Sequence, residues 1–253
     1  MQAIRCRRGA DPEYKRAVDI PGGLRQPGQT LIFDADDTLW ENNKLFEQVI
    51  ADFIGWLDHP TLDRDAIRAI LDDIERADTA VHGYGSAVFL QSLAACFRTL
   101  RERPASSEEI AHIEELAVAL LEHRIELMPG VADTLTLLGG RHHLMMLTKG
   151  AQAEQQAKID VSGLAPHFRS VHIVREKDEH TYRSLLGERS LDPATTWMIG
   201  NSPRSDILPA RAVGMRAVHL PNVHTWVLDH ADLDPADTGI LTLTRFTDLA
   251  DHF

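Results

Sequence analysis

The feature that most constrains the fold is the alternation of short apolar segments with helical patterns in the C-terminal half of the chain. The apolar segments lie at 144–147, 171–174, 197–199 and 217–220, and the helical patterns at about 131–138, 151–159, 179–187 and 204–213. Strands that are separated by helices pair in parallel through right-handed crossovers. We therefore predict an α/β fold with a parallel sheet, to which residues 240–243 add a last edge strand.

An earlier apolar run begins at Thr30 and ends abruptly in an acidic cluster. Leu31-Ile32-Phe33 is typical of a strand buried on both faces, and Asp34-Ala35-Asp36-Asp37-Thr38 follows it directly. Three acids in four residues repel one another unless something positive binds them. Asp37 is expected to be a capping residue or to face solvent.

Between these two parts lies a block with helical periodicity, residues 41–127. Apolar residues recur at i, i+3, i+4 and i+7 from Phe46 to Leu57, and similar patterns predict three further helices. The fourth is expected to begin near 106–109, where serines cap and acids favour the N-terminus, and to run through Leu121. We find no strand pattern in this block and predict an all-helical insertion.

The expected domain division follows from these patterns. Residues 1–28 form a loose lead-in that is rich in Gly, Pro and Arg, residues 29–40 and 128–253 form the core, and residues 41–127 form a helical cap.

Polar residues follow the ends of several predicted strands, namely Asp34, Asp36, Thr38, Thr148, Lys149, Lys177, Asn201, Ser202 and Asp206. Parallel strands point their carboxyl ends to one edge, and open α/β sheets bind ligands at that edge. The set combines carboxylates for a metal and a nucleophile, hydroxyls and amides for phosphate oxygens, and ammonium groups. Its convergence at one edge predicts an active site.

At these residues the sequence resembles the haloacid dehalogenase superfamily, in its phosphatase branch. The resemblance rests on Asp34-Ala35-Asp36-Asp37-Thr38 as a D-x-D-x-T motif, on Thr148 and Lys177 as the second and third motifs, and on residues 200–206 as the acidic fourth motif. The helical block sits where one subgroup inserts its cap. The resemblance implies a Rossmann-like three-layer core with an all-helical cap domain.

The resemblance also implies a mechanism. Asp34 would attack phosphorus and become an aspartyl-phosphate, and Asp36 would protonate the leaving alcohol and then activate water. Thr148, Lys149 and Lys177 would bind the phosphoryl group, with Lys177 neutralising its charge. Mg²⁺ would be held by the Asp34 carboxylate, the Asp36 backbone carbonyl and the fourth-motif loop, and a small phosphorylated metabolite would be the substrate.

The fourth motif departs from the family pattern, because Asn201 stands where the family usually has Asp. An amide oxygen ligates magnesium without contributing charge. Either Asp206 supplies the remaining carboxylate or the metal is bound more weakly than usual, and the sequence leaves both open.

Several alternatives stay open. A phosphomutase shares the same set of motifs. A dehalogenase shares the nucleophile but has no acid two residues later, so Asp36 argues against it. A phosphonate hydrolase would need a lysine in the cap, where only Lys44 is present. A binding module with little catalytic activity is the remaining alternative, because of Asn201.

Composition narrows the partners. A formal net charge of −12 disfavours nucleic acids and anionic membranes, and no apolar run is long enough to span a membrane. Two cysteines, Cys6 and Cys96, suit a reducing cytoplasm, the location that we expect. We expect Trp226 to cover the core rather than to contact substrate. His82, Tyr84 and Phe89 flank a glycine break and are candidates for lining the cleft, although Tyr and Phe at such positions are more often packing residues. The oligomeric state is not readable from the sequence.

Overall fold

The structure, a computed structural model, describes residues 26–122 and 125–253. The lead-in predicted for residues 1–28 therefore lies almost entirely outside the described residues, as does Cys6. The three described residues of that segment, 26–28, are exposed, and the backbone N–H of Gly28 donates to the carbonyl of Arg141.

The core is a six-stranded parallel sheet, as predicted. Its order is β5-β4-β1-β6-β7-β8. The strands are β1 (Thr30–Phe33), β4 (His143–Lys149), β5 (Ser170–Val174), β6 (Thr196–Gly200), β7 (Arg216–His219) and β8 (Ile240–Thr242). In the central strand, Ile32 lies opposite Met145 of β4 and Met198 of β6. The chain order reverses on the two sides of β1, so the carboxyl end of β1 lies where ligands bind in such sheets.

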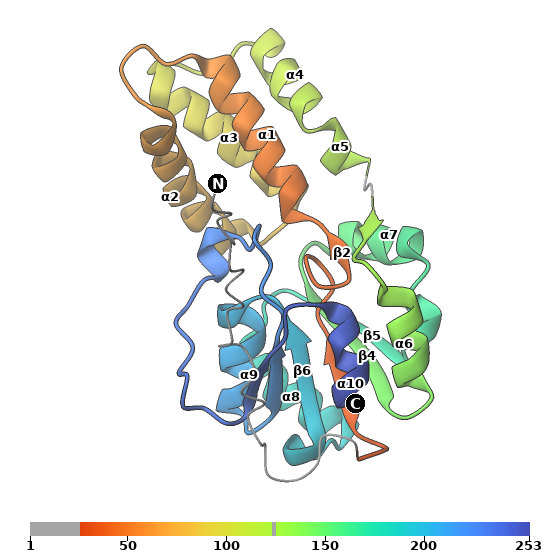
Figure 1. The fold of residues 1–253 in the computed structure, drawn as a ribbon. Helices are drawn as coiled ribbons and strands as arrows, with labels where there is room; N and C mark the ends of the chain where they lie inside the picture. Colours follow the sequence, from red (N-terminus) through yellow and green to blue (C-terminus); the bar gives the residue numbers. More distant parts are fainter. Residues whose placement is uncertain (1–25, 123–124) are drawn as a thin grey trace, which may run out of the picture.

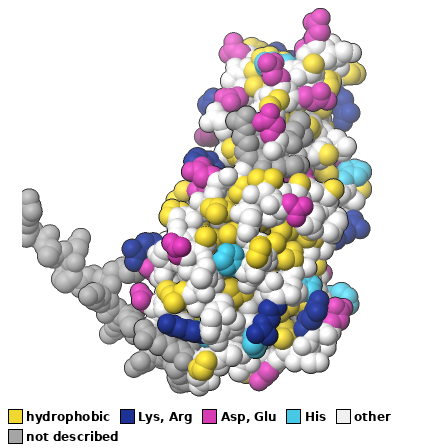
Figure 2. Space-filling view, turned by 90° about the vertical axis from the view of Figure 1, so that its right-hand side faces the viewer, with side chains coloured by type: hydrophobic (Ala, Val, Ile, Leu, Met, Phe, Trp, Pro, Cys, Tyr) yellow, Lys and Arg dark blue, Asp and Glu magenta, His cyan; other side chains and the backbone are white. Residues whose placement is uncertain are grey.

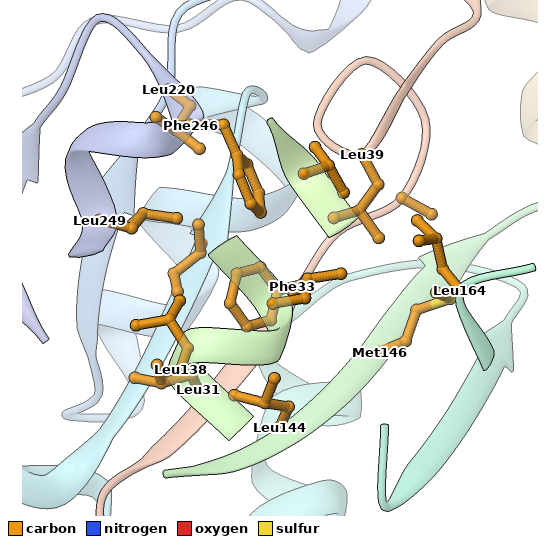
Figure 3. Close-up of a cluster of buried hydrophobic side chains, with 14 of the residues drawn as sticks. Leu31, Phe33, Leu39, Leu138, Leu144, Met146, Leu164, Leu220, Phe246 and Leu249 are labelled. Atoms are coloured by element: carbon orange, nitrogen blue, oxygen red, sulfur yellow. The ribbon is translucent and has the colours of Figure 1, made fainter. Parts of the chain in front are cut away.

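Helices cover both faces of this sheet (Figure 1). On one face lie α6 (Val131–Gly139), α7 (Gln152–Ser162) and α10 (Leu249–His252), and on the other lie α8 (Glu179–Arg189) and α9 (Leu208–Ala212). Side chains alternate accordingly: Leu31 and Phe33 pack in the cluster of the first face, drawn in Figure 3, and Ile32 packs in the opposite cluster. The three-layer α/β core is confirmed.

A helical bundle follows β1 and forms the upper part of Figure 1. It contains α1 (Asn43–Leu57), α2 (Arg64–His82), α3 (Ser86–Arg101), α4 (Ser107–Leu116) and α5 (Val118–Leu121). These helices enclose their own cluster of buried apolar side chains, separate from the two clusters of the core. Ser106 and Glu109 form the capping box that starts α4. The prediction of one continuous fourth helix is wrong, because α4 ends at Leu116 and Ala117 separates it from α5.

The insertion is not helical at its two ends. Trp40–Glu41 (β2) and Glu126–Leu127 (β3) pair as antiparallel strands where the chain leaves and re-enters the core. The prediction of a strand-free block over 41–127 is therefore wrong at these positions. The two segments are far apart in sequence, and each satisfies backbone hydrogen-bonding groups of the other. A local sequence pattern does not predict such a pairing. We propose that this ribbon marks the boundary between core and cap.

The helix predicted at 204–213 is also irregular. Its first part, Pro203–Ile207, is a π-helical turn, and α9 begins only at Leu208. Pro209 has no N–H to donate to the carbonyl of Ser205, and the buried hydroxyl of Tyr182 donates to that carbonyl instead, at 2.9 Å. The turn brings Asp206 into the site described below.

Within residues 26–122 and 125–253, no helix is both long and apolar enough to cross a bilayer. On the face shown in Figure 2, hydrophobic side chains are interspersed with charged ones.

Candidate active site

The site begins with Asp34, which directly follows the central strand β1. Asp34 is 5% exposed, and its carboxylate is held at both oxygens. The hydroxyl of Thr38 donates to Oδ2 at 2.9 Å, and the ammonium of Lys177 donates to Oδ1 at 2.5 Å. Residues from the first and third predicted motifs therefore meet at the carboxyl edge of the sheet.

Lys177 has a second carboxylate partner. Its Nζ lies 2.6 Å from Oδ1 of Asp206, which is fully buried. Oδ2 of Asp206 accepts the backbone N–H of Ser202 at 2.9 Å. A Cβ on Gly200 would lie 2.2 Å from that same oxygen, so only glycine fits at the end of β6. Both carboxylate oxygens of Asp206 are thus engaged inside the protein.

The electrostatics of this group favour a charged lysine. Burial lowers the pKa of Lys177, but Asp206 and Asp34 outweigh it, and the pKa lies above its ordinary value. Burial raises the pKa of Asp34 to about 7, with Asp206 adding to the increase and Lys177 opposing it. A cation in addition to Lys177 would favour the ionised carboxylate of Asp34.

Asp36 lies beside Asp34 and is held by two residues of α7. Lys158 Nζ lies 3.1 Å from Oδ2 of Asp36, and the side-chain amide of Gln155 donates to the same oxygen at 2.9 Å. The indole N–H of Trp40 donates to Oδ1 at 2.7 Å. Sequence reasoning missed Gln155 and Lys158. The available signal was a pair of long polar residues, three positions apart, in the helix that follows Thr148.

Thr148 and Lys149 end strand β4 at the same edge. Thr148 is buried, and its hydroxyl accepts the side-chain amide of Gln155 at 3.0 Å. Lys149 Nζ lies 2.8 Å from both the Ser205 hydroxyl and an oxygen of Asp229. Burial raises the pKa of Asp229, but Lys149, Ser205 and Lys177 together outweigh burial and hold it below its ordinary value. Lys149 therefore already has an anionic partner.

Asn201 follows β6 and turns its amide oxygen toward the acidic cluster. The Thr38 hydroxyl that donates to Asp34 also lies 3.4 Å from Oδ1 of Asn201. The amide nitrogen of Asn201 donates to the hydroxyl of Thr225 at 3.2 Å, which fixes the orientation of the side chain.

Asp37 has a structural role. Its carboxylate accepts the backbone N–H groups of Asn42 and Asn43, each at 2.9 Å, at the start of α1. It is buried, and burial raises its pKa to about 7 although these two hydrogen bonds lower it. The expectation of a capping residue agrees with these contacts, whereas the alternative of a solvent-facing side chain is wrong.

A cavity of about 140 Å³ lies between the core and the helical bundle, and the site residues that line it are Asp34, Asp36, Asp37, Thr148, Lys149, Lys177, Asn201 and Asp206. Phe46, Val88 and Phe89 contribute apolar walls from the bundle, and Trp226 lines the cavity from the core. The expectation that Trp226 only covers the core is wrong: its loop lies next to α2, and the Trp226 indole N–H donates to Glu75 at 3.3 Å. Tyr84 also lines the cavity, whereas His82 lines a separate surface depression.

No group of three or more His, Cys, Asp or Glu side chains in the described part of the chain is arranged to hold a metal ion. Magnesium does not require such a group, because it keeps several waters and uses one or two protein carboxylates together with substrate oxygens. The oxygens of Asp34 and Asn201 are of this type.

The family model for haloacid dehalogenase-like hydrolases matches residues 29–214, well over half of the chain. The chain belongs to the haloacid dehalogenase-like hydrolases. This haloacid dehalogenase-like hydrolase is thus an enzyme of the class that the four strand-end motifs predicted, with a helical cap inserted between the first and second motifs.

Two solved structures resemble this haloacid dehalogenase-like hydrolase over most of its length. A haloacid dehalogenase-like family hydrolase from Xanthomonas campestris has a TM-score of 0.75 and 26% identity, over 89% of this chain and 94% of that one. A 2-haloacid dehalogenase from Pseudomonas syringae pv. tomato has a TM-score of 0.57 and 20% identity, over 88% and 97%. The second likeness shows the fold alone.

Among curated proteins, a phosphoserine phosphatase from Thermus thermophilus is 34% identical over 80 residues. The match covers 30% of this haloacid dehalogenase-like hydrolase, which spans about a third of the length of that relative (32%). The proteins that this chain resembles thus include a phosphatase and a dehalogenase, and the choice between the two activities rests on the site residues.

Proposed function

We propose that the protein is a magnesium-dependent phosphatase that hydrolyses a small phosphate monoester through an aspartyl-phosphate on Asp34. One observation carries this proposal. Asp34 and Asp36 line the same cavity, the first beside Lys177 and the second held by Lys158 and Gln155. An oriented second carboxylate serves the proton transfers of ester hydrolysis, whereas halide displacement has no use for a proton on the leaving group.

The reaction follows from these positions. A carboxylate oxygen of Asp34 forms a bond to phosphorus while the bond from phosphorus to the alcohol oxygen breaks. Asp36 gives its proton to that oxygen as it leaves. Asp36 then accepts a proton from water, whose oxygen attacks phosphorus, and the carboxylate of Asp34 is released. Lys177 neutralises negative charge throughout, and the Thr148 hydroxyl orients a phosphoryl oxygen.

Magnesium fits the donors on this edge of the sheet. The Asp34 carboxylate, the Asp36 backbone carbonyl and Oδ1 of Asn201 would hold it. Asp206 is the weaker candidate for a direct ligand, because Lys177 and the Ser202 N–H already occupy its two oxygens. We therefore assign Asp206 to holding Lys177 in place. When bound, Mg²⁺ would neutralise charge on the phosphoryl oxygens so that a carboxylate can approach.

The size of the cavity supports a small substrate. Its volume of about 140 Å³ lies below the roughly 300–1,000 Å³ of pockets that bind drug-sized ligands. Helices α2 and α3 close the cavity on the side away from the sheet, so we expect the cap to open for entry and exit.

The test is release of inorganic phosphate from para-nitrophenyl phosphate with and without Mg²⁺, for the wild type, Asp34→Asn and the control Asp133→Asn, which changes an exposed acid on α6. We expect turnover that needs Mg²⁺, is lost in Asp34→Asn and persists in the control. Turnover that survives both chelation and Asp34→Asn would contradict the proposal. Chloride release from 2-chloropropionate would instead support a dehalogenase, and an isomerised sugar phosphate a mutase.

A further inference from the structure

The charges around the cavity do not balance. Among the described residues, seven carboxyl groups line it, namely those of Asp34, Asp36, Asp37, Glu75, Glu154, Asp206 and Asp229. The described residues that line it include three cationic side chains, Lys149, Lys158 and Lys177. With all of these groups ionised, the formal excess is seven minus three, or four negative charges, which is more than the two that one divalent cation neutralises.

Each of the three ammonium groups already has a carboxylate partner. Lys177 pairs with Asp34 and Asp206, Lys149 with Asp229, and Lys158 with Asp36, at 2.5–3.1 Å. A carboxylate in the alcohol part of a substrate would therefore have to displace an existing ion pair. The cavity is unfavourable for a substrate with a second negative group.

Glu75 differs from the other carboxyl groups of the cavity in how little compensates its charge. It projects from α2, is 5% exposed, and within residues 26–122 and 125–253 its one hydrogen-bond donor is the Trp226 indole N–H, at 3.3 Å. It forms no ion pair with any described residue, whereas Asp37 accepts two backbone N–H groups. A buried carboxylate that lacks a cation and lines a substrate cavity is costly unless a ligand supplies the charge.

Arg68, a cap cation that acts electrostatically on Glu75, has other carboxylate partners. Arg68 binds both oxygens of Glu47, at 2.6 and 2.9 Å, and Asp72 at 2.7 Å. Those two acids outnumber it, so the surroundings of Glu75 stay negative. Consistent with this, burial raises the pKa of Glu75 to about 7, although Trp226 and Arg68 act to lower it.

We propose that Glu75 is a specificity determinant that binds a cationic amino group in the alcohol part of the substrate, so that the preferred substrates are phosphate esters of amino alcohols. This inference rests on the proposed function. The phosphoryl group would lie against Asp34 and the ammonium against Glu75 on the cap. Trp226, which lines the same cavity, would add a cation–π contact.

Three phosphate esters of similar length test the proposal: 2-aminoethyl phosphate, propyl phosphate and carboxymethyl phosphate. They differ at the far end, which is an ammonium, a methyl group or a carboxylate. For the wild type with saturating Mg²⁺ we expect kcat/KM to be about 10- to 100-fold higher for the ammonium ester than for propyl phosphate, the range of a charged hydrogen bond. The carboxylate ester is expected to be the poorest of the three.

Glu75→Gln is the decisive variant, and Asp78→Asn is its control. Asp78 lies on the same helix, bonds to the Ser92 hydroxyl at 2.7 Å and does not line the cavity. We expect the ratio of the ammonium to the propyl ester to fall to about one in Glu75→Gln and to stay at the wild-type value in Asp78→Asn. General damage to the fold or to the metal site lowers both rates and leaves the ratio unchanged.

A wild-type ratio near or below one would overturn the inference, as would a ratio that Glu75→Gln preserves or that Asp78→Asn lowers equally. Binding separates this inference from the proposed function. If none of the esters and no para-nitrophenyl phosphate is hydrolysed, the proposed function fails. The role of Glu75 is then tested by calorimetry, which measures the binding of 2-aminoethyl phosphate and of propyl phosphate. The ratio of the two affinities is compared between the Asp34→Asn variant and the double variant that also carries Glu75→Gln.

Discussion

The ammonium nitrogen of Lys177 lies 2.6 Å from a carboxylate oxygen of Asp206, a side chain with no exposed surface. The same ammonium reaches Asp34 at 2.5 Å, so one cation is shared between a buried anchor and the proposed nucleophile. Asp206 comes from the π-helical turn after β6, and Gly200 leaves the space that it fills. Through this ion pair, Asp206 in the fourth motif holds Lys177 beside Asp34, a role that requires no contact between Asp206 and a metal ion.

Asp206→Asn tests this anchoring role. The substitution leaves Lys177 with Asp34 as its remaining carboxylate partner, so we expect the unfolding free energy to fall by about 1.5–3 kcal/mol, the range of one hydrogen bond to a charged group. Urea denaturation measures the loss, and we expect phosphatase activity to fall with it. The control is Asp248→Asn, which removes an exposed pair with Arg245 and should cost less than about 1 kcal/mol. Equal costs for the two variants would contradict the anchoring role.

Asn201→Asp tests the proposed metal ligand. The change adds a negative charge at a side chain that faces Asp34, so we expect the Mg²⁺ concentration that gives half-maximal activity to fall by about tenfold. Asn201→Ala should raise that concentration, because an oxygen ligand is lost. Activity against Mg²⁺ concentration, with calorimetry of Mg²⁺ binding, measures both. If neither variant changes the Mg²⁺ dependence, Asn201 is not a ligand.

Lys158→Met tests the positioning of Asp36. The ammonium lies 3.1–3.2 Å from both oxygens of that carboxylate, and its removal leaves Asp36 with Gln155 and Trp40 as hydrogen-bond donors but without its cation. We expect kcat to fall about 10- to 100-fold, part of the contribution of a positioned acid or base, with KM for para-nitrophenyl phosphate little changed. Lys158→Arg should recover part of the loss. A rise in KM at constant kcat would assign Lys158 to binding instead.

Glu75→Gln has a pH-dependent effect on stability. The pKa of Glu75 is about 7 in the folded protein and near 4.5 when unfolded, so the folded state binds more protons between these values. The contribution of Glu75 to the free energy of unfolding is therefore most favourable below about pH 4.5, and it is lost as the pH rises from about 4.5 to about 7. In the absence of substrate we expect the variant to be more stable by roughly 1–3 kcal/mol at pH 8.

Thermal denaturation across pH 5 to 8 measures this effect. The gain in Tm is expected to be a few degrees at pH 8 and to shrink toward pH 5. The control Asp78→Asn should show no such trend. A gain that is independent of pH would show that packing, rather than the charge of Glu75, accounts for the difference.

Much of the fold could be predicted from local patterns. The strand that ends at Phe33 is short, apolar and buried on both faces, and its neighbours in the sheet are separated by helical patterns. Because all six strands are parallel, residues at their carboxyl ends meet at one edge whatever the connecting segments contain. The positions of Asp34, Thr148, Lys177 and Asn201 follow from that geometry.

The pairing of β2 with β3 and the π-helical turn at Pro203–Ile207 could not be predicted in this way. β2 and β3 join residues more than eighty positions apart, and the turn depends on a hydrogen bond from Tyr182. Both features arise from contacts between segments that are distant in the sequence, and neither segment has a local pattern that identifies its partner.

Hydrophobic periodicity and strand polarity are local properties, so they predict the parallel sheet, most of the helical insertion and the residues at the edge of the sheet. The partners of those residues depend on how distant segments pack together. Lys158 orients Asp36, Asp206 engages Lys177 rather than facing the cavity freely, and Glu75 reaches that cavity from a helix of the cap. The physical reason is that ion pairs and cavity walls form between side chains brought together by folding, and their energy depends on burial that no single segment fixes.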